Sequence, residues 1–171
     1  AVSSHTGTLV DQAAMATAMF ARAGVLEFQD TEEMIKAAVA FSTLQPPRGK
    51  RIGIITNTGG PGVQAIDEAV VRDLTPAVWS PAGRQRLQES LYAEASLGNP
   101  VDVVATAGAD HYFAAIETLL AEADTDMVLV FMVTAPFVDI DAIARRIKEA
   151  TSKSTKPVVV VVEPSSKWYG L

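Results

Sequence analysis

The alternation of short apolar runs with amphipathic segments from Arg51 onward most constrains how this chain can fold. The short runs are rich in valine and isoleucine, which is typical of buried strands. The segments between them repeat apolar residues at helical spacing. The resulting β-α-β-α-β-α-β-α-β order predicts an α/β fold with a parallel sheet and helices on both faces. The predicted strands lie near residues 52–55, 76–79, 101–104, 127–133 and 157–162.

We expect a flavodoxin-like doubly wound five-stranded parallel sheet, with the strands in flavodoxin-like order. The run from Met127 to Val133 is continuously apolar, which predicts a central strand covered on both faces. Ligands of such folds bind at the carboxyl ends of the strands. The segments predicted to share that rim are residues 57–60, Ser80, residues 105–108, residues 134–135 and residues 163–164.

An N-terminal helical pair is predicted before the sheet. The first helix spans about residues 10–23 and ends at Gly24, and residues 25–28 form a strand or an extended connector. The sequence from Asp30 to Glu33 has the Asp-x-x-Glu form of a capping box, which predicts the start of the second helix. The stripe expected to be buried in that helix is Met34, Ile35, Ala38, Phe41 and Leu44.

The segment after the first predicted strand is rich in glycine. We expect Gly59 and Gly60 to take backbone angles closed to other residues, and Pro61 suits the first turn of a helix. The helix face expected to be buried is Val63, Ile66 and Val70. A strand, a glycine turn and a helix in this order direct free N–H groups and the positive end of the helix dipole at the turn. The turn is therefore a candidate site for a phosphate or a phosphorylated group.

A purely structural reading of the same turn stays open. Tight strand-to-helix turns of many doubly wound domains contain glycine for steric reasons. The sequence Gly59-Gly60-Pro61-Gly62 has neither the G-x-G-x-x-G spacing nor the Lys-Ser/Thr ending of known nucleotide loops. The residues of this segment alone do not separate the two interpretations.

Composition excludes several classes of function. The chain contains no cysteine, which excludes disulfides and thiolate metal sites and fits a reducing cytoplasm. A net charge of −6 argues against a nucleic-acid partner, because no basic stripe is available to neutralise phosphates. The longest apolar runs are too short to cross a bilayer. We expect a soluble cytoplasmic protein with no metal ligands of its own and no membrane or nucleic-acid partner.

The two histidines limit the chemistry further. A hydrolase would need a nucleophile, a histidine and an acid, and the chain has only His5 and His111. His111 falls in a helix predicted over residues 110–123 and is interpreted as a solvated residue. His5 has small hydroxyl and glycine neighbours, Ser-Ser-His-Thr-Gly-Thr, which leave its imidazole accessible. An accessible, oriented imidazole can act as a nucleophile toward phosphorus.

Three motifs in order resemble the NDP-forming acyl-CoA synthetases, relatives of succinyl-CoA synthetase. The first is the loop Ser4-His5-Thr6-Gly7, followed by a small-residue helix, Ala23-Gly24-Val25 and the acidic helix start. The second is Ile54-Ile55-Thr56-Asn57-Thr58-Gly59-Gly60-Pro61-Gly62-Val63, and the third is Gly98-Asn99-Pro100-Val101-Asp102. The resemblance runs from Ser4 to about Val162, which is nearly all of the chain.

The resemblance implies a phosphohistidine mechanism. In that family the loop histidine, matched here by His5, carries a phosphoryl group between an acyl phosphate and a nucleoside diphosphate. The overall reaction converts an acid, CoA and ATP reversibly to acyl-CoA, ADP and phosphate, with Mg²⁺. Two helix N-termini bind the phosphohistidine, and the glycine turn resembles the second of them. The phosphate-binding residues implied are Asn57, Thr58, Gly59, Gly60, Gly62 and Val63.

The resemblance also implies that parts of the family's enzymes lie outside this sequence. These parts are a CoA-binding domain, a first flavodoxin-like domain and an ATP-grasp module, as domains or subunits. Residues 1–8 are then the phosphohistidine loop that ends the upstream domain, and residues 9–171 are the second flavodoxin-like CoA-ligase domain. We expect this chain alone to bind none of the cofactors tightly and to be inactive. A small carboxylic acid is the implied substrate. The resemblance is also compatible with assembly of the chain into a homo-oligomer.

Two departures and two alternatives accompany this interpretation. Thr8 stands where alanine is common in the family loop, and Val10-Asp11-Gln12 replaces a small-residue continuation. The first alternative is a domain of a related protein acyltransferase or regulatory protein without ligase activity, although retention of His5 favours the ligase. The second is a flavin-binding or receiver module. Such a receiver would need a cluster of aspartates at the end of the first strand, which the sequence lacks.

Overall fold

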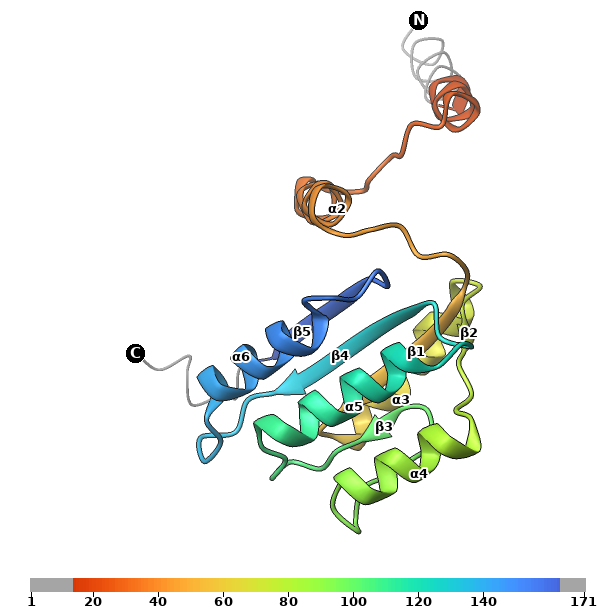
Figure 1. Ribbon diagram of the computed structural model, residues 1–171. Coiled ribbons are helices and arrows are strands. Elements are labelled where there is room, and N and C mark those ends of the chain that lie inside the picture. The colour runs from red at the N-terminus through yellow and green to blue at the C-terminus, as the bar shows by residue number, and fades with distance from the viewer. Residues whose placement is uncertain (1–13, 164–171) are drawn as a thin grey trace, which may run out of the picture. The chain divides into compact units, whose positions relative to one another are not determined.

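The computed structural model describes residues 14–163, which form two compact units (Figure 1). The first unit ends at Thr43 and consists of a helix over residues 14–23 and α2 (Thr31–Thr43). Gly24 has a φ of 71° and ends the first helix, as predicted. The Glu33 N–H donates to Asp30 Oδ1 at 2.8 Å, which confirms the predicted start of α2. Residues 25–28 are a connector without regular structure.

The predicted buried stripe of α2 is wrong. None of the residues of α2 is buried, and Met34, Ile35 and Phe41 are 49%, 55% and 73% exposed. The physical reason is that the described part of this unit contains two helices only, which give the apolar stripe no second layer to pack against. These side chains therefore remain an exposed apolar face of the first unit.

The second unit begins at Leu44 and is an α/β domain with a five-stranded sheet in which every strand pair is parallel. This confirms the predicted fold class. Its elements in chain order are β1 (Arg51–Thr56), α3 (Gly59–Val71), β2 (Thr75–Pro76), α4 (Pro81–Ser90), β3 (Val101–Asp102), α5 (Ala109–Ala121), β4 (Met127–Val133), α6 (Ile140–Thr151) and β5 (Val158–Glu163).

The order of the strands differs from the expected one. In the flavodoxin-like order 2-1-3-4-5 the third strand lies between the first and the fourth. Here β4 pairs directly with β1, and the order is β2-β1-β4-β5. On the opposite edge of β1, β2 pairs with the start of the strand, where Arg51 faces Thr75. On that same edge β3 pairs with the end of the strand, where Ile55 faces Val101. Both strands are two residues long, so one edge of β1 accommodates them in a row.

Helices cover both faces of the sheet, as predicted. Side chains on one face, among them Val128, Val130 and Met132 of β4, pack in one core with α4, α5 and α6. The neighbouring positions Met127 and Leu129 point to the opposite face, where they pack with Ile52 and α3. The large core therefore lies under three helices, and α3 alone covers β1 from the other side (Figure 1).

The buried face of α3 agrees with the expected one only at Ile66, which is partly buried against the core on this side of the sheet. Val63 and Val70 are 57% and 56% exposed, and the buried residues of this helix are Gly62 and Ala69. Glycine and alanine face the sheet because α3 lies so close to β1 that larger side chains do not fit there. A methyl group on Gly62 would lie 2.7 Å from Thr56 Cγ2. Leu87 of α4 and Leu91, which directly follows this helix, are buried.

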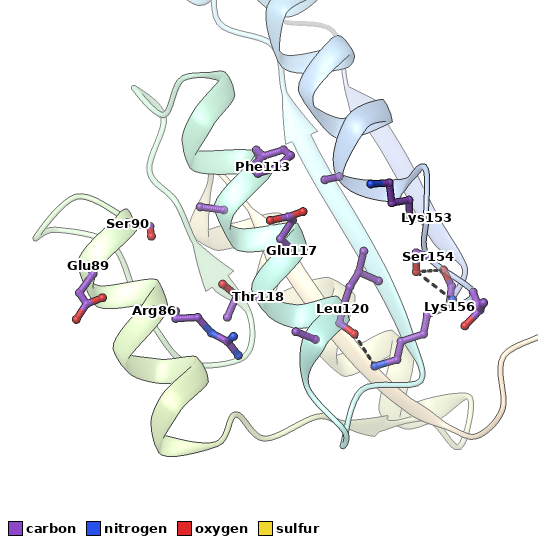
Figure 2. A pocket seen from close by; sticks show the side chains of 14 residues that line it. Arg86, Glu89, Ser90, Phe113, Glu117, Thr118, Leu120, Lys153, Ser154 and Lys156 are labelled. Atoms are coloured by element: carbon purple, nitrogen blue, oxygen red, sulfur yellow. Dashed lines mark hydrogen bonds between the residues drawn. The ribbon is translucent and has the colours of Figure 1, made fainter.

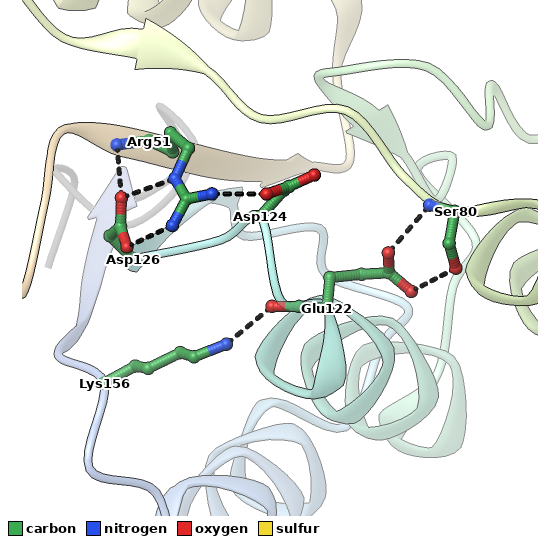
Figure 3. A network of polar contacts seen from close by, with 6 residues as sticks. All are labelled: Arg51, Ser80, Glu122, Asp124, Asp126 and Lys156. Atoms are coloured by element: carbon green, nitrogen blue, oxygen red, sulfur yellow. Dashed lines mark hydrogen bonds and ion pairs between the residues drawn. The ribbon is translucent and has the colours of Figure 1, made fainter.

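Charged groups form a network at the amino ends of the strands (Figure 3). Arg51 Nε donates to Asp126 Oδ2 at 2.8 Å, and its Nη2 donates to Asp126 Oδ1 at 2.9 Å. The buried Glu122 carboxylate accepts hydrogen bonds from the Ser80 N–H at 2.7 Å and the Ser80 hydroxyl at 2.9 Å. Lys156 Nζ donates to the Glu122 backbone carbonyl at 2.7 Å, which caps the end of α5.

This network corrects the placement of Ser80. The sequence predicted Ser80 at the rim made by the carboxyl ends of the strands. Glu122, which binds Ser80, lies between the end of α5 and the start of β4, so Ser80 is at the opposite end of the sheet. The reason is that β2 ends early, at Pro76, and pairs only with the start of β1. Ser80 instead caps α4, because its hydroxyl accepts the Gly83 N–H at 3.0 Å.

Candidate phosphate-binding site

The glycine-rich segment lies at the carboxyl end of β1, where α3 begins. Thr58 is the N-cap residue with φ −156° and ψ 130°, and its side chain makes no capping hydrogen bond. Gly59 and Gly60 are the first two residues of the helix, and Pro61 has no N–H. The Gly62 N–H donates to the Thr58 carbonyl at 3.4 Å. The N–H groups of Gly59 and Gly60 thus lie at the positive end of α3 without an intrahelical acceptor.

The predicted reason for these glycines is wrong. Within the described residues only Gly24, Asp73 and Val104 have a positive φ, so Gly59 and Gly60 do not use backbone angles closed to other residues. A methyl group on Gly60 would meet no atom within 4 Å, and one on Gly59 would meet only Asp102 Oδ2, at 3.9 Å. Their lack of a side chain leaves the end of α3 uncovered, which is what a ligand approaching the two N–H groups requires.

The side chain of Asn57 does not face a ligand. It is 5% exposed and spans to the end of β4, where its Nδ2 donates to the Val133 carbonyl at 2.8 Å and its Oδ1 accepts the Val133 N–H at 2.9 Å. These two bonds continue the pairing of β1 with β4 by one position. Asn57 is therefore a structural residue of the bend, and its side chain is already occupied by the Val133 backbone.

Thr56 fixes the bend from within. Its hydroxyl donates to the Thr58 carbonyl at 2.8 Å and accepts the Thr58 N–H at 3.1 Å. The Thr58 N–H is consequently occupied. Val63 is the fifth residue of α3, so its N–H falls in the regular helical pattern, and its side chain is exposed. Of the six predicted phosphate-binding residues, Gly59 and Gly60 retain N–H groups directed beyond the helix.

Asp102 lies beside this helix end, and the sequence interpretation assigned it no role. It pairs in register with Thr56, and its Oδ1 accepts the Val104 N–H at 3.0 Å. Val104 has a φ of 66°, which is a strained angle for a β-branched residue. The structure ends β3 at Asp102, two residues before the predicted end of that strand, which brings this carboxylate to the same rim as the glycine turn.

Tyr112 lies under this rim. Its side chain is 1% exposed, and its hydroxyl has no hydrogen-bond partner among the described residues. Burial, and then the negative charge of Asp102, raise the pKa of Tyr112 above its ordinary value. The phenol therefore stays protonated and neutral over the physiological range.

Of the two histidines, only His111 lies within the described residues. His5 lies outside the described residues. His111 was interpreted as a solvated helix residue, but it is half-buried, and its Nδ1 accepts the Gly108 N–H at 3.1 Å. Its ring also lies against Tyr92, with ring centroids 4.2 Å apart. His111 thus holds the start of α5, because its imidazole caps a backbone N–H that precedes the helix.

A concave surface lies away from the glycine turn, between α4, α5 and the connection from α6 to β5 (Figure 2). It is lined by residues of both charges, among them Arg86, Glu89, Glu117 and Lys153. Lys156 at its border donates to the Leu120 carbonyl at 2.7 Å, so this ammonium already has a structural role. The mixed charge gives no preference for an anion. The described residues also hold no cluster of three or more His, Asp or Glu side chains suited to a metal ion.

Comparison with known proteins identifies relatives along nearly the whole chain. The alpha subunit of the ADP-forming acetate–CoA ligase II of Pyrococcus furiosus is 33% identical over 168 residues, which cover 94% of this chain and 36% of that subunit. A crystal structure of a Pyrococcus horikoshii protein matches with a TM-score of 0.81 and 31% identity, over 89% of this chain and 36% of that one. No protein-family model matches the chain.

A third similarity is to the dinucleotide forming acetyl-coenzyme A synthetase 1 of Candidatus Korarchaeum cryptofilum, solved in complex with phosphate and ADP. It matches with a TM-score of 0.75 and 27% identity, over 87% of this chain and 32% of that one. The chain thus spans about a third of the length of these relatives.

None of the described helices is long and apolar enough to cross a membrane.

Proposed function

This chain belongs to the NDP-forming acyl-CoA synthetases, to whose ADP-forming acetate–CoA ligases it is 31–33% identical over most of its length, and we propose that it acts as one domain of such an enzyme. The proposed reaction of the whole enzyme converts a small carboxylic acid, CoA and ATP to acyl-CoA, ADP and phosphate, reversibly and with Mg²⁺. Nucleotide, metal and CoA would be held by the rest of the enzyme.

The observation that carries the proposal is the uncapped start of α3. Gly59 and Gly60 direct N–H groups away from the helix, and Thr58 leaves them uncovered because its side chain makes no capping bond. Two N–H donors at a helix N-terminus stabilise a phosphoryl group by hydrogen bonds and by the helix dipole, without a lysine. We propose that this end of α3 binds the phosphoryl group while it is carried on His5.

Asp102 then has a role in the same step. Its carboxylate lies close to Gly59 and would repel a phosphoryl dianion at the end of α3 unless a proton donor lay between them. The second ring nitrogen of a phosphohistidine supplies such an N–H. We therefore assign Asp102 the orientation of the phosphorylated imidazole. Asp102→Asn should lower the phosphoenzyme yield, while Asp110→Asn, which removes an exposed partner of Arg146, should not.

The remaining parts of the enzyme are proposed from the length of the relatives. Because the chain spans 36% of the Pyrococcus furiosus alpha subunit, we propose that a CoA-binding domain, a first flavodoxin-like domain and an ATP-grasp module complete it as domains or subunits. In this assignment residues 1–8 form the phosphohistidine loop and the domain comprises residues 9–171, in the cytoplasm. The chain alone should not catalyse the reaction. We also propose that it can self-associate into a homo-oligomer, which sedimentation measures.

Phosphoryl labelling of the complete protein tests the proposal. The protein is incubated with γ-labelled ATP and Mg²⁺, and acid-labile protein-bound phosphate is counted. His5→Ala should abolish the label, whereas His111→Ala, at the other histidine of this sequence, should retain it in the folded fraction. Label that persists in His5→Ala would remove the assigned role. A protein that never acquires label would instead favour a related acyltransferase or regulatory protein without ligase activity.

Substitution of the helix start is a second test. Gly60→Val should lower the phosphoenzyme yield with little loss of fold, because a side chain at Gly60 meets no atom within 4 Å and would instead cover the N–H groups. Circular dichroism and thermal melting establish that the fold is kept. An unchanged yield in the folded variant would contradict binding of the phosphoryl group at this end of α3.

A further inference from the structure

The outermost strand of the described sheet, β5, pairs with β4 alone. The Val128 N–H donates to the Pro157 carbonyl at 3.0 Å, and the Thr134 N–H donates to the Glu163 carbonyl at 2.9 Å. Odd-numbered residues of β5 therefore direct their backbone groups at β4. Since backbone groups alternate in direction along a strand, the N–H and C=O groups of Val158, Val160 and Val162 point away from the sheet.

Apart from Glu163 at its end, the side chains of β5 are apolar, and they are exposed on both faces. Val159, Val160, Val161 and Val162 are 43%, 39%, 39% and 49% exposed. Parallel strands are normally buried on both faces, and natural edge strands carry lysine, proline, a bulge or a very short length. The run of five valines from Val158 to Val162 has none of these features. By its chemistry β5 is an interior strand.

The positions across the sheet give the same answer. A flavodoxin-like sheet has five positions side by side. The five strands here fill four, because β2 and β3 share one edge of β1, followed by β1, β4 and β5. One position therefore remains at an edge of the sheet. The position count calls for one more strand, and the exposed valines locate it on the outer side of β5.

We propose that a further parallel strand, supplied by the same polypeptide after Glu163, pairs with the outer edge of β5. The step from β4 to β5 runs outward across the sheet and places α6 on the same face as α5. A second outward step with a right-handed crossover places its helix on that face too, beside α6, over Val160 and Val162. A crossover needs at least about ten residues, so the strand itself follows Leu171. This inference rests on the proposed function in that the chain is part of a longer protein.

Backbone amide exchange in the 171-residue chain and in the complete protein tests this. In the short chain the amides of Val159 and Val161 should be protected, and those of Val160 and Val162 should exchange rapidly. In the complete protein, exchange at Val160 and Val162 should slow by roughly a hundredfold or more, as for amides that enter a sheet. Equal exchange of these two amides in both proteins would overturn the proposal.

Thiol labelling provides a matched control, because the described chain lacks cysteine. In a cysteine-free background, Val160→Cys should react readily in the short chain and slowly in the complete protein. Val71→Cys, at a 79% exposed position of α3, should react in both. Protection of Val160→Cys that appears in the short chain alone and increases with its concentration would show pairing with a second copy, and would overturn the proposal.

The same preparations separate this inference from the proposed function. Phosphate on His5 with an unprotected Val160 and Val162 would contradict the additional strand and leave the phosphohistidine mechanism intact. Protection of Val160 and Val162 without any phosphate on the protein would support the strand and contradict the mechanism.

Discussion

The side-chain carboxamide of Asn99 binds the backbone of Ile54 as a neighbouring strand would. Its Oδ1 accepts the Ile54 N–H at 3.0 Å, and its Nδ2 donates to the Ile52 carbonyl at 2.8 Å. Nδ2 also donates to the Ala77 carbonyl at 3.0 Å. Asn99 thus fills the interval between β2 and β3 along the edge of β1 and satisfies the Ile54 N–H, while the Ile52 carbonyl also accepts the Ala77 N–H at 2.9 Å.

Asn99→Ala should therefore reduce the free energy of unfolding by about 1–3 kcal/mol, since it leaves the Ile54 N–H of a buried strand without its partner. Asn99→Asp should destabilise at least as much at neutral pH, because a carboxylate cannot donate to the two carbonyls. Urea unfolding followed by circular dichroism measures both. Gln85→Ala, which removes only an exposed bond to Glu89, is the control. Loss of stability equal to that control would show that the Asn99 bonds are dispensable.

Gly62→Ala and Gly60→Ala should have opposite effects. A methyl group on Gly62 would lie 2.7 Å from Thr56 Cγ2 and 3.1 Å from Pro100 Cγ, so we expect a loss of about 1–3 kcal/mol from overpacking. A methyl group on Gly60 meets nothing within 4 Å, and alanine favours a helix over glycine by up to about 1 kcal/mol. Thermal melting compares the two variants. A more stable Gly62→Ala would mean that α3 does not approach β1 this closely.

Acid should destabilise the domain partly through Asp126. The Arg51 side chain and N–H bond this carboxylate and lower its pKa from 3.8 to about 2. A carboxyl group with a lower pKa in the folded state stabilises the fold fully above pH 3.8, and this contribution is lost as the pH falls toward 2. Asp126→Asn should be less stable at neutral pH and should lose less stability between these pH values.

The measurement is the midpoint of urea unfolding from pH 7 downward, with Asp67→Asn on the exposed side of α3 as the control. The control should follow the unsubstituted protein at every pH. If Asp126→Asn showed the same acid dependence as the unsubstituted protein, the pairing with Arg51 would not be the source of that dependence.

Tyr112→Phe should be neutral or stabilising by up to about 1 kcal/mol, because the lost hydroxyl is buried and has no partner among the described residues. Tyr112→Leu should be destabilising, since it changes the shape of a fully buried side chain. Calorimetric melting separates these outcomes. A Phe variant that is less stable by more than about 1 kcal/mol would indicate that the hydroxyl is hydrogen-bonded after all.

The sequence predicted the elements well and their lateral order less well. Apolar runs and the Ser80-Pro81 cap depend on local chemistry, so β1, β4, β5 and the start of α4 could be located from the sequence. Two short strands share one edge of β1 because the side chain of Asn99 takes the place of a strand between them. Asn99 binds the carbonyl of Ile52, which lies 47 residues earlier in the chain. Periodicity in one segment contains no information on such a long-range bond.

The candidate site shows the same division. The presence of glycines indicated an accessible helix start, but periodicity placed Val63 and Val70 inward, because it cannot register that Gly62 contacts Thr56 and Pro100. Asn57 was predicted to bind phosphate because it precedes the glycines. Its side-chain amide instead donates a hydrogen bond to the Val133 carbonyl, 76 positions further along the chain. Asp102 was missed because the strand that was predicted to run to residue 104 ends at Asp102 itself.

The extended Thr58 at the start of α3 makes the melting temperature of the domain a test of the proposed phosphate binding. A threonine in that position ordinarily stabilises a helix through its own hydroxyl, and here it does not. An oxyanion that binds there supplies the missing acceptor to the folded protein alone. The melting temperature of the domain should consequently rise with inorganic phosphate more than with chloride at matched ionic strength, and Gly60→Val should remove that difference.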